Sequence, residues 1–282
     1  MNTTGEYWPR IREALSGAAH RTAALLRRTL DPAALGTGTW TAAETGAHLA
    51  FTLAADLTAT GGRVPDLSPH LLSQAIGIAR ATDVAELNAA TLESDPERDL
   101  GSLSARIEDR AAAFLEHTAE AMGDEPVTWL GGVKLPVSAV AGHWIGEALI
   151  HSQDIAGGSG LPWTMEPAWA ELAFTRFLVP MLEASDPRAF VDQHRADGKK
   201  TRVEIRVRGA EPVLIVLDDG ALRVERSSTT RASCYVAADA PTNFLLSWGR
   251  IDPLRAAATG RLRVWGSKPW KALQLARALR MP

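Results

Sequence analysis

The sequence predicts a helical N-terminal region followed by an α+β domain with a mainly antiparallel sheet. Up to about residue 184, apolar residues recur three and four positions apart, which is typical of amphipathic helices. From Thr201 the period changes to two, and residues 202–208 alternate charged with β-branched side chains. Strands framed by helices indicate an α+β domain. We therefore expect two domains, residues 1–160 and residues 161–282.

The composition is that of an ordinary globular protein. The chain has 282 residues, of which 46% are hydrophobic and 22% are charged, and this length suffices for two cores. A net charge of −3 gives no overall field that attracts nucleic acid or anionic lipid. The single cysteine, Cys234, excludes an intramolecular disulfide and a cysteine-based zinc cluster. Because it falls in an expected strand, we interpret it as a buried, unreactive thiol.

The chain has no apolar run long enough to span a membrane, and its N-terminus lacks the basic and then apolar pattern of a signal peptide. We therefore expect a cytoplasmic protein, either a monomer or a homodimer. Its expected partners are small molecules, with no nucleic acid and no membrane among them.

The helices of the N-terminal region are predicted in order along the chain. The first covers residues 7–30, where apolar residues recur at helical spacing. The second begins at Thr41, which matches a capping box with Glu44, and a glycine pair at 61–62 ends it. Further helical stretches are expected over residues 67–81, 85–92 and 103–122.

The next helix carries the most informative pattern. It starts after Pro136, which suits a first helical turn, and a glycine pair at 157–158 closes it. At about 100° per residue, its ionisable side chains fall within an arc of about 80°. They are His143, Glu147, His151 and Asp154. The rest of the circumference is largely apolar, so this polar stripe is not expected to face water.

Buried imidazoles and carboxylates need partners, and one metal ion satisfies several of them. Glu147 and His151 lie one turn apart, so both can reach the same ion. His48, which lies among apolar residues of the second helix, is the third candidate ligand. Three protein ligands leave one coordination position of zinc open, as in catalytic sites. A simpler alternative is that these three residues only bond one another.

Two further residues of the stripe have more than one interpretation. Asp154 lies one turn beyond His151 and could hold its second ring nitrogen, or it could bond the exposed end of the helix. His143 could be a ligand, an acid–base group or a bonded core histidine.

The C-terminal elements follow from period and turn signals. A helix is expected over residues 166–184 and a polar loop over residues 185–200. The turn at 218–220 joins two strands in a hairpin. The arginines of residues 202–208 are expected to face water, and this strand lacks the interleaved aromatics of a nucleic-acid-binding sheet. Strands are expected over residues 202–208, 212–217, 221–226, 232–237 and 260–266, and helices over residues 241–248 and 269–279.

Several of these segments resemble a known family. Residues 40–49, 131–136 and 147–156 resemble the DinB-like four-helix bundle of the mycothiol-dependent maleylpyruvate isomerase family. Residues 248–253 and 260–266 resemble its sterol-carrier-like C-terminal domain. The resemblance covers most of the chain, and its first-half motif is the more specific one. It implies a DinB-like bundle followed by a sterol-carrier-like α+β domain.

The resemblance also implies a site. Carried over, the family's metal ligands are His48, Glu147 and His151, which bind zinc or another divalent metal, and the cosubstrate is the thiol mycothiol. Arginines in the cleft between the domains are expected to hold acidic substrates. His143 and Trp144 depart from the isomerase pattern at the ligand helix. The residues expected to bind substrate or thiol are Arg250, Arg261 and Trp144, with Arg80 as a weaker candidate whose alternative is a solvated surface arginine.

The expected chemistry follows from an open metal position. A thiol that binds a divalent cation becomes a thiolate at neutral pH and can attack an electrophilic carbon. We favour thiol S-transfer to an electrophilic small molecule, in specialised metabolism or detoxification, over maleylpyruvate-type cis–trans isomerisation. A hypothesis from another class is a carrier that binds an apolar ligand in its C-terminal domain.

Overall fold

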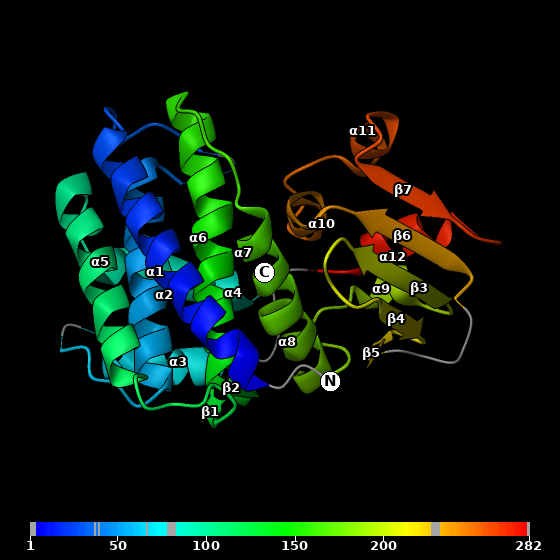
Figure 1. Ribbon diagram of the computed structural model, residues 1–282, viewed down its shortest axis with the longest axis horizontal. Helices are drawn as coiled ribbons and strands as arrows, with labels where there is room; N and C mark the ends of the chain where they lie inside the picture. The colour runs from blue at the N-terminus through cyan, green and yellow to red at the C-terminus, as the bar shows by residue number, and fades with distance from the viewer. Residues whose placement is uncertain are drawn as a thin grey trace.

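A computed structural model describes residues 4–36, 38, 40–65, 67–77, 83–226 and 232–280. A helical N-terminal region is followed by an α+β domain with a mainly antiparallel sheet, so the predicted fold class is confirmed. In Figure 1 the long helices lie side by side at the left and the sheet lies at the right. The division at residue 160 stays a prediction.

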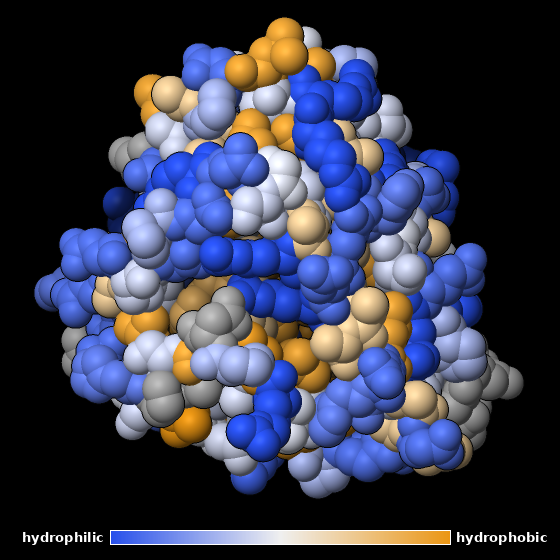
Figure 2. All heavy atoms as spheres, turned by 90° about the vertical axis from the view of Figure 1, so that its left-hand side faces the viewer, coloured by the Kyte–Doolittle hydropathy of each residue, from blue (hydrophilic) through white to orange (hydrophobic). Residues whose placement is uncertain are grey.

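Four long helices form the bundle: α1 (Thr4–Arg28), α2 (Ala42–Ala59), α5 (Leu100–His117) and α6 (Val137–Ser159). Helix α6 packs against α1 and α2 and is buried over most of its circumference, as its apolar composition predicts. It ends at Gly160, whose φ of 65° suits the left-handed cap that glycine adopts without strain. Figure 2 looks at the bundle side of the molecule and shows a largely hydrophilic surface with hydrophobic side chains in a central hollow.

The start of α2 is fixed by the capping box that the sequence predicts. The Thr41 hydroxyl accepts a hydrogen bond from the Glu44 amide at 3.1 Å, and the Glu44 carboxylate accepts one from the Thr41 amide at 2.8 Å. Both donors would otherwise lack a partner within the helix.

Short elements connect the long helices. Helices α3 (Pro69–Ile76) and α4 (Val84–Ser94) lie between α2 and α5. Strands β1 (Pro126–Thr128) and β2 (Lys134–Pro136), joined through the single turn η2 (Leu130–Gly132), form a small hairpin before α6. The sequence gives no such hairpin, because strands this short show no period. Helix α5 also ends at His117 and not at 122, as the segment 118–122 turns away.

The expected helix over 166–184 is interrupted by a wide turn. The segment consists of α7 (Pro167–Leu172), the wide turn itself, which is the π-type segment η3 (Ala173–Leu178), and α8 (Val179–Ala184). Pro180 lacks an amide hydrogen, and its ring would clash with the carbonyl of Arg176 in a regular α-helix. The wide turn relieves this clash.

The sheet has the strand order β5-β4-β3-β6-β7. Every neighbouring pair is antiparallel except β3 with β6. Asp219 (φ 49°) and Gly220 (φ 72°) form the turn of the predicted hairpin between β4 and β5. The strands are β3 (Lys200–Val207), β4 (Val213–Asp218), β5 (Ala221–Arg226), β6 (Cys234–Ala238) and β7 (Leu262–Trp265).

Helices complete the C-terminal domain, and Cys234 is buried there, as expected. Burial raises the pKa of its thiol. The expected helices at 241–248 and 269–279 correspond to α10 (Ala240–Ser247) and α12 (Lys271–Ala278). Two further helices, α9 (Gln193–Ala196) and α11 (Pro253–Ala258), are additional, since elements of four to six residues are too short for a helical period.

The arginines of β3 are not all free in water. Arg206 and Arg208 are exposed as expected, but Arg202 is half-buried beside Glu225. Neighbouring strands also bring aromatic rings beside Arg206, whose guanidinium lies 5.1 Å from the ring centre of Tyr235. Tyr235 in turn stacks on Trp265. Strand pairing thus supplies aromatics that β3 itself lacks.

Within the described part of the chain, no helix combines the length and the apolarity that crossing a bilayer requires.

Candidate metal and substrate site

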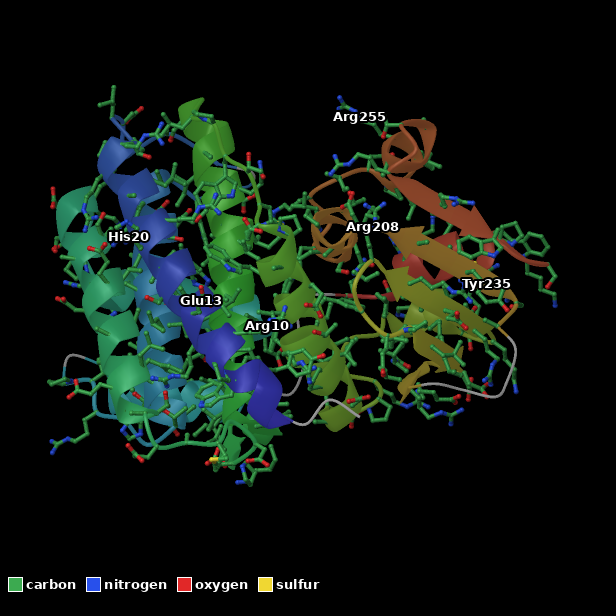
Figure 3. All side chains as sticks on the ribbon, in the orientation of Figure 1. Arg10, Glu13, His20, Arg208, Tyr235 and Arg255 are labelled. Atoms are coloured by element: carbon green, nitrogen blue, oxygen red, sulfur yellow. The ribbon has the colours of Figure 1, made fainter. Side chains whose placement is uncertain are left out.

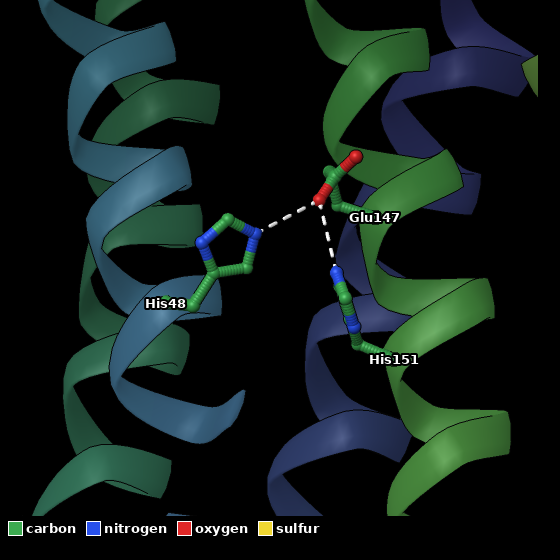
Figure 4. Close-up of side chains that lie close together, drawn as sticks. All are labelled: His48, Glu147 and His151. Carbon is green, nitrogen blue, oxygen red and sulfur yellow. Dashed lines mark hydrogen bonds and ion pairs between the residues drawn. The ribbon is translucent and has the colours of Figure 1, made fainter. Parts of the chain in front are cut away.

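Three candidate donor atoms converge from two helices. His48 lies on α2, and Glu147 and His151 lie one turn apart on α6 (Figure 4). Glu147 Oε2 is 3.1 Å from His48 Nε2 and 3.3 Å from His151 Nε2. One such atom from each residue lies within 4.8 Å of the other two. The helical spacing of α6 and the phase of α2 thus bring the three predicted ligands to one point.

Burial makes this cluster electrostatically strong. The side chains of His48, Glu147 and His151 are only 4%, 14% and 13% exposed. Burial alone would raise the pKa of Glu147, but hydrogen bonds with His151 and His48 lower it well below its usual value. Burial would likewise lower the pKa of His151, yet hydrogen bonds with Asp154 and Glu147 raise it to about 9. Burial dominates at His48 and lowers its pKa.

The donor set fits a divalent metal ion. Two imidazole nitrogens and one carboxylate oxygen are ligands that zinc prefers, and three protein ligands leave room for a further one. Among the described residues, His48 Nδ1 is buried without a hydrogen-bond partner, so no hydrogen bond at that nitrogen ties the ring to another group. The same short distances also suit protonated His151 bonding Glu147 directly, which is the simpler alternative.

The predicted partner of His151 lies beside it. Asp154 Oδ2 is 3.5 Å from His151 Nδ1, an ion-pair distance. The same carboxylate accepts two hydrogen bonds from Arg250. Arg250 Nε lies 3.0 Å from Oδ1, and Nη2 lies 2.8 Å from Oδ2. Burial alone would raise the pKa of Asp154, but His151 and Arg250 lower it. A chain of charges therefore runs from the C-terminal domain to the cluster.

The residues expected to bind substrate are placed differently from one another. Arg250 lines the cavity described below, although its guanidinium is held by Asp154. Arg261 instead donates to the Thr242 hydroxyl at 3.1 Å and is not among the lining residues. Trp144 is fully buried and donates to the Leu49 carbonyl at 3.1 Å, so it packs between α6 and α2 and not in the cavity. Arg80 lies outside the described residues.

His143 belongs to a second polar group, whose other members, Asp56 and Trp129, come from different elements. Its Nδ1 lies 2.8 Å from Asp56 Oδ2, and Asp56 Oδ1 accepts a hydrogen bond from Trp129 Nε1 at 3.1 Å. Burial alone would lower the pKa of His143, but the Asp56 carboxylate raises it. His143 Nε2 lies 3.7 Å from Glu147 Oε1, so this group adjoins the cluster of His48, Glu147 and His151.

Asp56 and Trp40 were missed as site residues. Asp56 is eight residues after His48, about 80° further around α2, so both face the same side of the helix. This spacing is a sequence signal that could identify Asp56 as a site residue. The Trp40 ring lies 4.8 Å from the His48 ring and 5.9 Å from the His151 ring between centres, and so covers both imidazoles. No local pattern predicts that contact, because Trp40 precedes the helix.

A cavity of about 650 Å³ opens beside the cluster. This volume lies within the range of small-molecule sites. Its walls come from the segment before α2, from α2, α4, the turn at 129–133, α6, the π-type segment η3 and α8, and from residues within 185–190 and 248–250. His48, Asp56, His143, Glu147, His151 and Asp154 all line it. A molecule bound there would meet both polar groups at once.

Comparisons with known proteins agree with this architecture. Residues 183–280 match the SCP-2 sterol transfer family. The structure is similar to the crystal structure of a mutant of the mycothiol-dependent maleylpyruvate isomerase. The two have a TM-score of 0.50 and 14% sequence identity, and the match covers 89% of this chain and 93% of that one. For the unsubstituted isomerase the TM-score is 0.49, with 15% identity and the same coverage.

A smaller likeness concerns the C-terminal part. The UbiJ-SCP2 ubiquinone synthesis protein is 22% identical over 30% of this chain and 73% of its own, with a TM-score of 0.23. No curated protein matches the sequence. At these identities the likenesses concern the fold alone. The chain is thus similar in fold to the mycothiol-dependent maleylpyruvate isomerase over most of its length, and its C-terminal third matches the SCP-2 sterol transfer family.

Proposed function

We propose that this protein is a metal-dependent enzyme that transfers a low-molecular-weight thiol, mycothiol, to an electrophilic small molecule. One observation carries the proposal. The donor atoms of His48, Glu147 and His151 lie together on the wall of a cavity large enough for a ligand. The similarity in fold to the mycothiol-dependent isomerase is the reason for choosing mycothiol as the thiol.

His48, Glu147 and His151 would hold the divalent ion, zinc being the first candidate. When bound, such an ion lowers the pKa of a coordinated thiol and supplies a thiolate at neutral pH. Asp154 faces the second nitrogen of His151 and so fixes its ring orientation and tautomer, while Arg250 fixes Asp154.

Other side chains prepare the cavity for the reaction. Trp40 packs on both imidazoles and keeps water from that side of the cluster. Asp56 holds His143 Nδ1, which leaves Nε2 as the ring nitrogen able to exchange a proton with a bound molecule. We assign His143 this acid–base role and Asp56 the role of positioning it.

The reaction forms one carbon–sulfur bond. The thiol sulfur attacks an electrophilic carbon, and the thiol proton passes to the protein or the solvent. In transfer by addition, a proton returns to the neighbouring carbon; in transfer by displacement, the leaving group departs with its electron pair. In the alternative, cis–trans isomerisation, the adduct rotates and the carbon–sulfur bond breaks again, releasing the thiol unchanged. Both outcomes use the same residues.

Metal analysis and a thiol-dependent assay test this proposal. We expect about one divalent ion per chain in protein purified without chelator, and adducts of mycothiol with an electrophile by mass spectrometry. His151→Ala should lose both the ion and the turnover, whereas His194→Ala, at an exposed position of the C-terminal domain, should lose neither. Wild-type protein that contains no stoichiometric metal would refute the metal-dependent reaction and leave the three residues as a bonded core cluster.

The match to the SCP-2 sterol transfer family supports a second candidate function, the carriage of an apolar ligand. A carrier should be stabilised against heat by lipid and not by thiols, and His151→Ala should not change that response. The proposed enzyme should be stabilised against heat by thiols and not by lipid, and His151→Ala should change that response. The predicted cytoplasmic location and the monomeric or dimeric state stay proposals.

A further inference from the structure

Part of the cavity wall is apolar, and it adjoins the Asp56–His143 group, since the rings of Trp129 and Phe177 each lie 4.8 Å from the His143 ring. Aromatic and aliphatic side chains from different elements gather there, and Trp129 and Phe177 pack edge to face with 5.3 Å between ring centres. Phe177 lies on the wide turn of η3, which is the segment that Pro180 distorts. The members of this wall are Phe51, Leu87, Trp129, Phe177, Met181 and Phe190.

Among the described lining residues, carboxylates outnumber lysine and arginine side chains. Asp56, Glu147, Asp154 and Asp186 contribute four carboxylates, and Arg250 is the single lysine or arginine among the described lining residues. Its guanidinium is already engaged: Nε and Nη2 donate to Asp154, and Nη1 donates to the Trp248 carbonyl at 3.2 Å. His143 and His151 are likewise paired, with Asp56 and with Glu147 and Asp154, so a substrate carboxylate would find no unpaired cationic side chain among the described lining residues.

We propose that the electrophile taken by this cavity is an uncharged apolar or aromatic molecule and not a dicarboxylate. This inference rests on the proposed function and specifies its substrate class. Burying apolar surface against the wall contributes about 25 cal/mol per Å². A carboxylate moved there would lose its hydration, would meet His143, His151 and Arg250 only where Asp56, Glu147 and Asp154 already pair with them, and would lie near those carboxylates. The metal cluster is assigned to the thiol, so it does not serve as the anion site.

The transfer step on such a molecule balances without a further reactant. With an aryl halide, the thiol sulfur forms a bond to the ring carbon, the carbon–halogen bond breaks, halide leaves with the electron pair, and the thiol proton is released. With an activated alkene, sulfur bonds to one carbon and a proton ends on the other.

Direct binding tests the ligand class independently of turnover. N-phenylnaphthylamine, an uncharged aromatic probe that fluoresces in apolar surroundings, and succinate, a dicarboxylate, are titrated into metal-loaded and chelator-treated protein. Trp129 and Trp248 line the cavity, so their quenching reports occupancy. We expect micromolar binding of the naphthylamine in both forms and no response to millimolar succinate. Succinate binding more tightly than the naphthylamine would overturn the inference.

Two pairs of variants locate the binding. Phe190→Ala should weaken the naphthylamine about tenfold by removing apolar surface, whereas Leu254→Ala, 72% exposed and outside the lining, should not change it. Asn88→Arg adds an unpaired cation to the lining and should create succinate binding that the neutral control Asn88→Gln lacks. Equal naphthylamine affinity in Phe190→Ala and wild type would place the probe elsewhere and overturn the inference.

A turnover comparison separates this inference from the proposed function. Chlorodinitrobenzene and a chlorodinitrobenzoate share one leaving group and differ by one carboxylate. With mycothiol, we expect at least a tenfold higher kcat/KM for the uncharged compound. Preference for the benzoate would overturn the ligand class and keep the enzyme. Naphthylamine binding without any thiol transfer would refute the proposed function and keep the apolar ligand class.

Discussion

Arg250, which follows α10, forms a two-point ion pair with Asp154 near the end of α6. Arg250 Nε lies 3.0 Å from Oδ1 and Nη2 lies 2.8 Å from Oδ2 of the carboxylate. Asp154 in turn lies 3.5 Å from His151 Nδ1. The α+β domain therefore contributes to the geometry of a histidine on the bundle. The candidate metal site within the bundle is thus linked, through Asp154, to a side chain 96 residues later in the chain.

The first prediction concerns this ion pair. Arg250→Ala should lower zinc affinity about 10- to 100-fold, because Asp154 loses the partner that fixes it against His151. Competition with a chromophoric chelator measures the affinity. Arg255→Ala is the matched control, since Arg255 extends from α11 away from the rest of the molecule (Figure 3). Unchanged zinc affinity in Arg250→Ala would show that the pair only joins the two parts of the chain.

The second prediction concerns metal removal. Zinc added to chelator-treated protein should raise Tm by several degrees, since a ligand at 100 times its Kd stabilises the folded state by about 2.7 kcal/mol. His48→Ala should abolish this shift because it removes one of the three donors. His20→Ala changes an exposed histidine on α1 and should keep it. A zinc-induced shift of wild-type size in His48→Ala would contradict the proposed ligand set.

The third prediction separates the acid–base group from the metal cluster. Asp56→Asn keeps the shape of a buried side chain but removes the charge that holds His143. We expect a loss of about 100-fold in kcat with full metal content, in keeping with the usual size of acid–base contributions. Asp109→Asn, at an exposed position of α5, should be silent. If Asp56→Asn lost its metal together with its activity, Asp56 would instead support the cluster itself.

The fourth prediction uses the capping box of α2. Thr41→Ala should lower the free energy of unfolding by about 1 kcal/mol, which denaturant titration measures. The hydrogen bond from the Thr41 amide lowers the pKa of Glu44 below its ordinary value of 4.5. Since the folded pKa is the lower one, the stabilisation by Glu44 is present above pH 4.5 and is lost as the pH falls through the folded pKa.

The same cap gives a comparison across pH. The difference in stability between wild type and Glu44→Gln should therefore be larger at pH 7 than at pH 3. If the difference in stability between wild type and Glu44→Gln became larger as the pH falls, the Glu44 carboxylate would not act through the cap.

Local patterns were enough to predict much of the site. Helical phase alone placed His143, Glu147, His151 and Asp154 along one face of α6, because side-chain direction within a helix depends only on the number of residues between them. The capping box likewise predicted the start of α2. The change of period at Thr201 predicted the sheet.

What only the tertiary structure decided is which faces meet. Trp144 lies on the same helix as the ligands and yet packs in the core, whereas Arg250 reaches the site from another domain and is neutralised there by Asp154. The sequence by itself determined the directions of side chains within each element, since these are set by bonds and local hydrogen bonding. Contacts such as those of Trp40 and Asp56 depend on how separate elements pack, and that is decided by the burial of apolar surface from the whole chain.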